Sequence, residues 1–204
     1  MRRGFTLIEM LVVIGIIAVL VSATAVAYNG VVVRAQNVRA EEQVHELVTA
    51  LVEVMQKDDA WPRPVLAEGG SGKGEVTPEV GGALAKRGAL SLSYRETSDN
   101  GATRYVLSGP DKFGVLDPWA EKVVRRKLKS GALSLDTKVP TGGTLRDHRY
   151  RFAVDGDYDG KVTVSGDGIS ATIRASAVVW GAGRDGKFGT KDDLRSWNQG
   201  QEVK

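Results

Sequence analysis

Apolar residues form one almost uninterrupted run near the start of the chain. Residues 5–27 read FTLIEMLVVIGIIAVLVSATAVA, and Glu9 carries the only charge among them. A helix rising about 1.5 Å per residue would take this run across the roughly 30 Å of hydrocarbon in a bilayer. Arg2 and Arg3 precede the run and the bulk of the chain follows it. The pattern therefore predicts a single membrane helix with a cytoplasmic N-terminus and an exported C-terminal domain.

After residue 27 the apolar pattern becomes periodic. Charged residues separate apolar positions that recur at helical spacing, and no proline occurs before Pro62. The apolar positions are Val38, Val44, Leu47, Val48, Leu51 and Met55. We therefore expect one helix over about residues 5–57, with residues 28–62 forming its amphipathic half and exit turn. His45 is expected to face solvent or the core, because no second histidine stands at helical spacing.

Residues 63–204 alternate between short apolar runs and glycine-rich stretches. Strands are predicted over 88–95, 103–108, 149–154 and 171–180, while 66–82 has the composition of a flexible loop. Asp99, Asn100 and Gly101 suggest a turn that makes the first two strands a hairpin. A long helix followed by short antiparallel strands is an α+β arrangement.

Composition excludes several kinds of site. The chain has 204 residues and no cysteine, so it has neither disulfides nor thiolate metal ligands, and a bound metal ion is the remaining candidate staple. The net charge of +3 becomes 3 − 2 = +1 if Arg2 and Arg3 are removed, which gives little reason to expect a nucleic-acid partner. We interpret the basic run at 122–129 as a solvated face or subunit contact. It contains Lys122, Arg125, Arg126, Lys127 and Lys129.

Glu9 needs a partner, because an unpaired carboxylate in hydrocarbon costs several kcal/mol. Cleavage between Gly4 and Phe5 would free an α-ammonium close to Glu9 in the sequence. In a helical filament the ammonium of one subunit could meet Glu9 of its neighbour and fix their register.

The run Gly4, Phe5, Thr6, Leu7, Ile8, Glu9, followed by about twenty apolar residues, resembles the leader of type IV pilins and type II secretion pseudopilins. The resemblance implies that residues 1–4 form a leader peptide, that a prepilin peptidase cuts after Gly4, and that Phe5 is N-methylated. It also implies a type IV pilin-like fold.

An acidic, glycine-rich loop lies near the C-terminus, at residues 181–197. Calcium takes six to eight oxygen ligands from carboxylates and backbone carbonyls, and the loop offers Asp185, Asp192 and Asp193 among four glycines. Composition alone also allows a solvated turn. Residues 155–160 read DGDYDG, like the opening of an EF-hand loop, but an acid is missing from the twelfth position. We interpret this second loop as a hairpin turn, with Asp155, Asp157 and Asp159 as weaker metal candidates.

The C-terminal loop resembles that of the major pseudopilin of type II secretion, which binds calcium there. The order of Trp180, Asp185-Gly186, Asp192-Asp193-Leu194 and Trp197 matches, as do Asp117-Pro118-Trp119 and Trp61-Pro62. The resemblance implies calcium ligands at Asp185 and Asp193, then Asp192. Ala-Glu-Lys replaces the family's run after Trp119, and residues 64–112 and 120–147 are longer than the family core needs.

No catalytic constellation is visible. His148, between Asp147 and Arg149, is expected at the surface, and no enzymatic activity is predicted. The favoured function is a subunit of a type II secretion pseudopilus in the bacterial inner membrane, with a periplasmic domain. Its expected partners are copies of itself, other pseudopilins, the prepilin peptidase and the secretion platform. The alternatives are a type IV pilin or minor pilin in adhesion, motility or DNA uptake, and a membrane-anchored calcium-binding domain that does not polymerise.

Overall fold

The computed structural model describes residues 6–67, 72–99, 101–128 and 133–203, apart from the side chains of residues 23, 25–27, 29, 67, 99 and 199. The chain forms two compact units, Met1–Val38 and Arg39–Lys204. Helix α1 (Leu7–Asp58) begins in the first unit and ends in the second. The expected helix over about residues 5–57 is therefore confirmed within the described residues, and Phe5 lies outside them.

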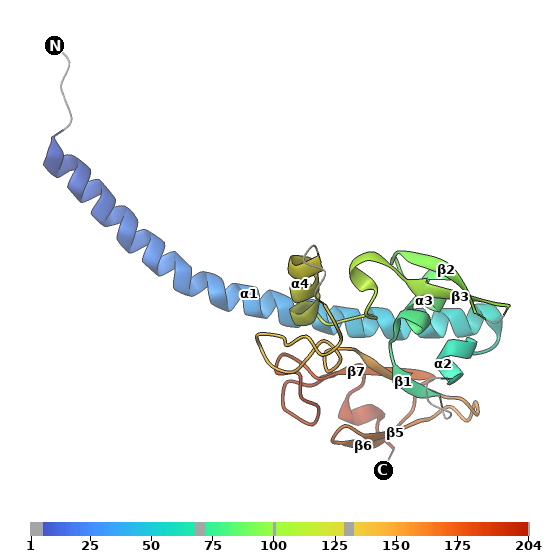
Figure 1. Cartoon of the computed structure of the whole chain (residues 1–204). Coiled ribbons are helices and arrows are strands. Elements are labelled where there is room, and N and C mark those ends of the chain that lie inside the picture. Colours follow the sequence, from blue (N-terminus) through green and yellow to red (C-terminus); the bar gives the residue numbers. More distant parts are fainter. Residues whose placement is uncertain (1–5, 68–71, 100, 129–132, 204) are drawn as a thin grey trace. The chain divides into compact units, whose positions relative to one another are not determined.

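A four-stranded antiparallel sheet forms the centre of the second unit (Figure 1). Its order is β1-β4-β7-β8, and the strands are β1 (Lys73–Glu75), β4 (Arg151–Val154), β7 (Ala177–Gly181) and β8 (Leu194–Arg195). The sheet packs against the part of α1 that belongs to this unit. Buried side chains of α1, including Val44, Leu47 and Leu51, join Phe152 and Val179 of the sheet in one core. This arrangement confirms the α+β class.

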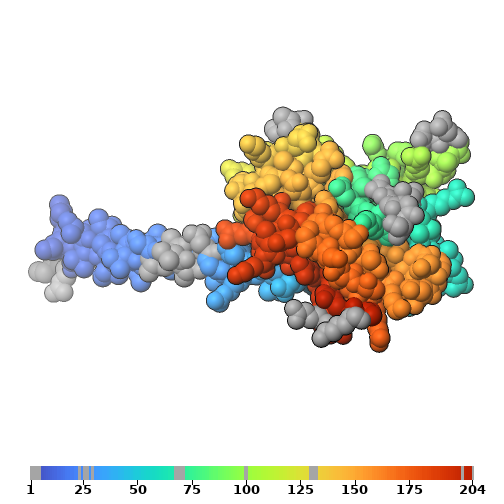
Figure 2. Space-filling view, turned by 90° about the horizontal axis from the view of Figure 1, so that it is seen from below, coloured from blue at the N-terminus to red at the C-terminus, as the bar shows by residue number. Residues whose placement is uncertain are grey.

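Two separate hairpins complete the strands. Strands β2 (Tyr94–Asp99) and β3 (Ala102–Leu107) pair with each other, as the turn signal predicted. Strands β5 (Val162–Gly166) and β6 (Ile169–Ile173) form the other pair. The face drawn in Figure 2 shows much of this C-terminal part of the chain, coloured orange to red.

Three short helices were not predicted from the sequence. They are α2 (Arg63–Ala67), α3 (Pro78–Lys86) and α4 (Pro118–Lys127), with 3₁₀ turns at Gly109–Asp111 and Gln199–Gln201. Thr77 and Asp117 cap α3 and α4 directly before a proline, a common way for a helix to start. The basic run at 122–129 therefore lies largely on α4, where Lys122, Arg125 and Arg126 are exposed.

Several strand predictions need correction. Residues 66–82 are not a continuous loop, because they contain the end of α2, all of β1 and the start of α3. The strand expected at 88–95 begins only at Tyr94. The strand expected at 171–180 is two strands, because β6 ends at Ile173 and β7 begins at Ala177 in a different sheet. Alternation alone does not reveal which partner a strand has.

Val38 does not belong to the buried face of α1, although its spacing placed it there. Its side chain is 63% exposed, whereas Ala40, Val44, Leu47, Leu51 and Val54 are buried. The buried stripe begins where the second unit begins, so helical spacing placed the stripe correctly but extended it by one residue too many.

Candidate functional site

Three reciprocal hydrogen bonds between Thr6 and Glu9 cap the start of α1. The Thr6 amide and hydroxyl donate to Glu9 Oε2 at 2.8 and 2.7 Å, and the Glu9 amide donates to Thr6 Oγ1 at 3.4 Å. This is a capping box, whose sequence signature is Ser or Thr followed three residues later by an acid. Gly4 and Phe5, at the expected cleavage site, lie outside the described residues.

Beyond this cap, α1 exposes large apolar side chains around its circumference. From Leu7 to Val21 they are all at least 45% exposed. In the part of the chain whose side chains the structure describes, no helix offers an apolar stretch long enough to cross a membrane. The span expected over residues 5–27 includes Phe5 and the side chains of residues 23 and 25–27, which lie outside the described residues.

The C-terminal acidic loop is organised by its own main chain. Asp192 Oδ2 accepts hydrogen bonds from the Arg184 and Asp185 amides at 2.8 and 3.1 Å. The carboxylate of Asp193 accepts from the Gly189 and Thr190 amides. Burial alone would raise the pKa of Asp192, but hydrogen bonds from the Thr190 hydroxyl and from backbone amides lower it overall. Asp185 Oδ1 accepts from the Lys187 amide at 2.8 Å, so all three expected ligands accept main-chain hydrogen bonds within the loop.

The second acidic loop brings its carboxylates closer together. Asp155, Asp157 and Asp159 each offer an oxygen, and these oxygens lie within 4.8 Å of one another. Asp155 is buried, and its carboxylate accepts hydrogen bonds from the Asp159 and Gly160 amides at 3.1 and 2.8 Å. The loop is not the expected hairpin turn, because β4 pairs with β1 and β7 whereas β5 pairs with β6. It instead carries the chain from one sheet to another.

A buried ionisable pair joins helix α4 to the loop before β4. His148 Nδ1 lies 2.6 Å from Asp117 Oδ2, and His148 Nε2 lies 2.9 Å from the Gly142 carbonyl oxygen. Asp117 Oδ1 also accepts hydrogen bonds from the Trp119 and Ala120 amides and so caps α4. Both side chains are at most 1% exposed. The expectation that His148 lies at the surface is wrong.

The hydrogen bonds of this pair require two protons, one on His148 Nε2 and one between His148 Nδ1 and Asp117. Both ring nitrogens of His148 face acceptor groups, so the Nε2 proton and the proton shared with Asp117 must both be present for every contact to be a hydrogen bond. Burial opposes the charged imidazolium, but Asp117 and the Gly142 carbonyl outweigh it and raise the pKa of His148. Burial also raises the pKa of Asp117. Both shifts mean that the folded pair binds protons more tightly.

We expect the stability of the fold to decline as pH rises above about 6.5 because of this pair. A raised pKa of His148 stabilises the fold fully below its unfolded pKa of about 6.5, and the contribution is lost as pH rises through the folded value. One proton gives a slope of at most about 1.4 kcal/mol per pH unit. Thermal unfolding of the full chain in detergent micelles, measured from pH 6 to pH 9, tests this. The decline should vanish in His148→Gln and persist in His45→Gln, which changes the exposed histidine on α1.

Comparison with known proteins concerns the N-terminus. Residues 1–25 match the family of the prokaryotic N-terminal methylation motif. This methylation motif is a prepilin-type signal, and it supports a type IV pilin-like protein without distinguishing a pseudopilin from other pilins. No curated protein and no solved structure matches the chain. The methylation motif ends inside α1, and residues 7–25 of the motif belong to this helix.

Proposed function

We propose that this chain is a filament subunit of the pseudopilin kind, which is anchored in the bacterial inner membrane and assembled to drive export of folded proteins. The methylation motif at residues 1–25 carries the proposal. Three further features support it: α1 continues from the motif to Asp58, the chain has no cysteine, and the rest is a small α+β domain. The role is structural, and its partners are other subunits, a prepilin peptidase and the assembly platform.

The capping box gives Glu9 a role before and after processing. In the uncut chain its carboxylate is satisfied by Thr6. Cleavage after Gly4 would place a new ammonium on Phe5, next to Thr6, where it competes for the same carboxylate. A charged pair in a medium of low dielectric is stronger than a neutral hydrogen bond. Glu9 can therefore exchange a local partner for the ammonium of a neighbouring subunit.

Mass spectrometry and filament recovery test the proposal together. In cells that contain a prepilin peptidase, the mature protein should lack residues 1–4 and carry one methyl group on Phe5. Glu9→Gln should be cleaved but recovered in sheared filaments at least about tenfold less, which corresponds to about 1.4 kcal/mol or more of subunit contact. Glu46→Gln, on the exposed side of α1, is the matched control.

The outcomes separate the three functions. An intact Met1 or an unmethylated Phe5 would contradict any pilin-like role. Processing without filaments would favour the membrane-anchored domain. If filaments form, deleting the gene should abolish export of folded proteins for a pseudopilin. Loss of adhesion, motility or DNA uptake with normal export would instead identify a type IV pilin.

We propose also that the chain binds a structural calcium ion. Two acidic loops support this: the one with Asp185, Asp192 and Asp193, and the one in which three carboxylates converge at Asp155, Asp157 and Asp159. Calcium at about 100 times its dissociation constant would add about 2.7 kcal/mol. That corresponds to roughly 5 to 10 °C in melting temperature for a chain of this size.

Paired substitutions would identify the loop. Asp185→Asn with Asp193→Asn, and separately Asp157→Asn with Asp159→Asn, are compared with the unchanged protein in calcium and in chelator. Only one of the two double substitutions should abolish the rise in melting temperature that calcium causes. The same melting temperature in calcium and in chelator would rule out a structural ion.

A further inference from the structure

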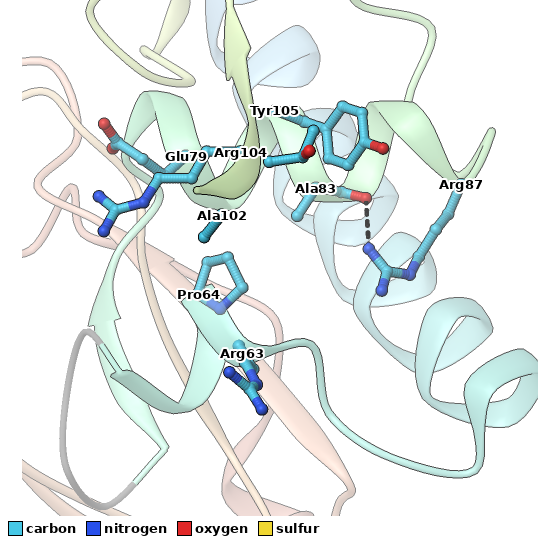
Figure 3. A pocket seen from close by; sticks show the side chains of 9 residues that line it. Arg63, Pro64, Glu79, Ala83, Arg87, Ala102, Arg104 and Tyr105 are labelled. Carbon is cyan, nitrogen blue, oxygen red and sulfur yellow. Dashed lines mark hydrogen bonds between the residues drawn. The ribbon is translucent and has the colours of Figure 1, made fainter. Parts of the chain in front are cut away.

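The second unit contains a groove, and none of the residues that line it belongs to the methylation motif. It has a volume of about 690 Å³, which is within the usual range of roughly 300–1,000 Å³ for ligand sites. Its walls are Arg63 and Pro64 of α2, Glu79 and Ala83 of α3 with the C-cap residue Arg87, and residues 102–105 of β3. Figure 3 shows Pro64, Ala83 and Ala102 between these walls, with the arginine side chains around them.

The β3 wall is a strand edge that α3 covers at Tyr105 and that is open near the turn, at Thr103. Strands β2 and β3 form a two-stranded sheet, and four consecutive β3 residues, 102–105, line the groove. Along an edge strand, successive residues direct their main-chain N–H and C=O groups alternately toward the partner strand and away from it. The Arg104 carbonyl lies 3.5 Å from the Thr97 hydroxyl of β2. A Cβ built on Gly82 of α3 would lie 2.3 Å from the Tyr105 carbonyl oxygen, so that carbonyl faces α3 and not β2.

Thr103 shares the orientation of Tyr105, two residues along the strand. It stands opposite Ser98 in the register and is exposed. No main-chain hydrogen bond from outside the hairpin reaches Thr103 among the described residues. An exposed edge of this kind can pair with an added strand.

The charges around the groove favour an acidic occupant. Three arginines and one glutamate, Glu79, line it, and Arg104 is already engaged in an interaction of its own. Arg87 is already engaged, because its Nε lies 2.5 Å from Asp58 Oδ2 and its NH1 donates to the Ala83 carbonyl (Figure 3). The exposed Arg63 forms no ion pair with any residue that the structure describes. Its guanidinium can therefore pair with a carboxylate without breaking a contact.

We propose that this groove binds an extended acidic segment of a partner protein, which adds a strand to the edge of β3. Main-chain hydrogen bonds at Thr103 supply affinity, and carboxylates at Arg63 select acidic sequences. Pro64 and Ala83 receive the small apolar side chains that alternate with the acids. This interaction is distinct from filament assembly and does not depend on Glu9.

The test uses the full-length protein in detergent micelles and a fluorescein-labelled ten-residue peptide of alternating glutamate and valine. Fluorescence anisotropy should show saturable binding, and the same peptide with lysine in place of glutamate should bind at least about tenfold more weakly. Arg63→Glu should weaken the binding of the acidic peptide by a similar factor. Thr103→Pro should abolish binding, because proline removes the outward amide.

Ser98→Pro is the matched control, since Ser98 stands opposite Thr103 on the other strand. It should bind the acidic peptide like the unchanged protein, and all variants should keep its melting temperature. Equal binding of both peptides, or unchanged binding by a folded Thr103→Pro variant, would overturn the proposal. So would self-association in sedimentation experiments that Thr103→Pro abolishes, because the occupant would then be a second copy of this chain.

Discussion

Asp117→Ala should lower the free energy of unfolding by about 3–5 kcal/mol, the usual loss when one partner of a buried charged pair is removed. The substitution leaves His148 with a buried ring nitrogen that has lost its partner at 2.6 Å. It also removes the acceptor that caps α4 through the Trp119 and Ala120 amides, which alone costs about 1 kcal/mol. The melting temperature should fall by roughly 6–20 °C, as circular dichroism can measure.

Two further variants separate the parts of this effect. Asp117→Asn keeps a good helix cap but loses the charge, so it should fall between the unchanged protein and Asp117→Ala. Asp136→Ala removes an exposed aspartate and should change stability by less than about 0.5 kcal/mol. If the melting temperature of Asp117→Ala falls no further than that of Asp136→Ala, the buried pair does not stabilise the domain.

Gly82→Ala should destabilise the protein by about 1–3 kcal/mol, the usual range for overpacking. In a free helix this change would stabilise by up to about 1 kcal/mol. Here the new Cβ would lie 2.3 Å from the Tyr105 carbonyl oxygen, 2.5 Å from its carbon and 2.7 Å from the Val106 nitrogen. These are main-chain atoms of β3, so the helix α3 must move away from the strand. Denaturant unfolding of the full chain measures the loss.

The neighbouring glycine supplies the matched control. A Cβ on Gly81 would lie 2.5 Å from Leu107 Cδ1, an atom of a side chain and not of the main chain. Gly81→Ala should therefore cost less than Gly82→Ala. Equal losses would mean that the approach of α3 to the β3 main chain is not the cause.

Local patterns predicted the long helix well, because its signals are local. The apolar run, the periodic stripe and Pro62 fix α1 within two residues of its described ends. The Thr6–Glu9 cap was missed although Thr-x-x-Glu is its signature, because the intramembrane carboxylate suggested an intermolecular partner first. Asp117-Pro118 is likewise a local signal for the start of a helix, an N-cap residue followed by proline.

Features that depend on distant segments could not be predicted. The burial of His148 requires Asp117, 31 positions earlier, and the turn at Gly142, and no local pattern brings these together. The convergence of Asp155, Asp157 and Asp159 depends on the change of sheet between β4 and β5. The pattern of aspartates and glycines favours the loop at Asp185, whereas the closeness of the other three carboxylates is evident only from the distances between them.

The central sheet has a consequence for the order of folding. Its strands lie at 73–75, 151–154, 177–181 and 194–195, and β4, between β1 and β7, is the second of them to be synthesised. Pairing of β1 with β4 closes a loop of more than seventy residues, and contacts so distant in sequence form slowly. A ribosome that has made only the first 150 residues has produced no pair of this sheet. The domain therefore completes its core only after β8, at Leu194–Arg195, has been synthesised.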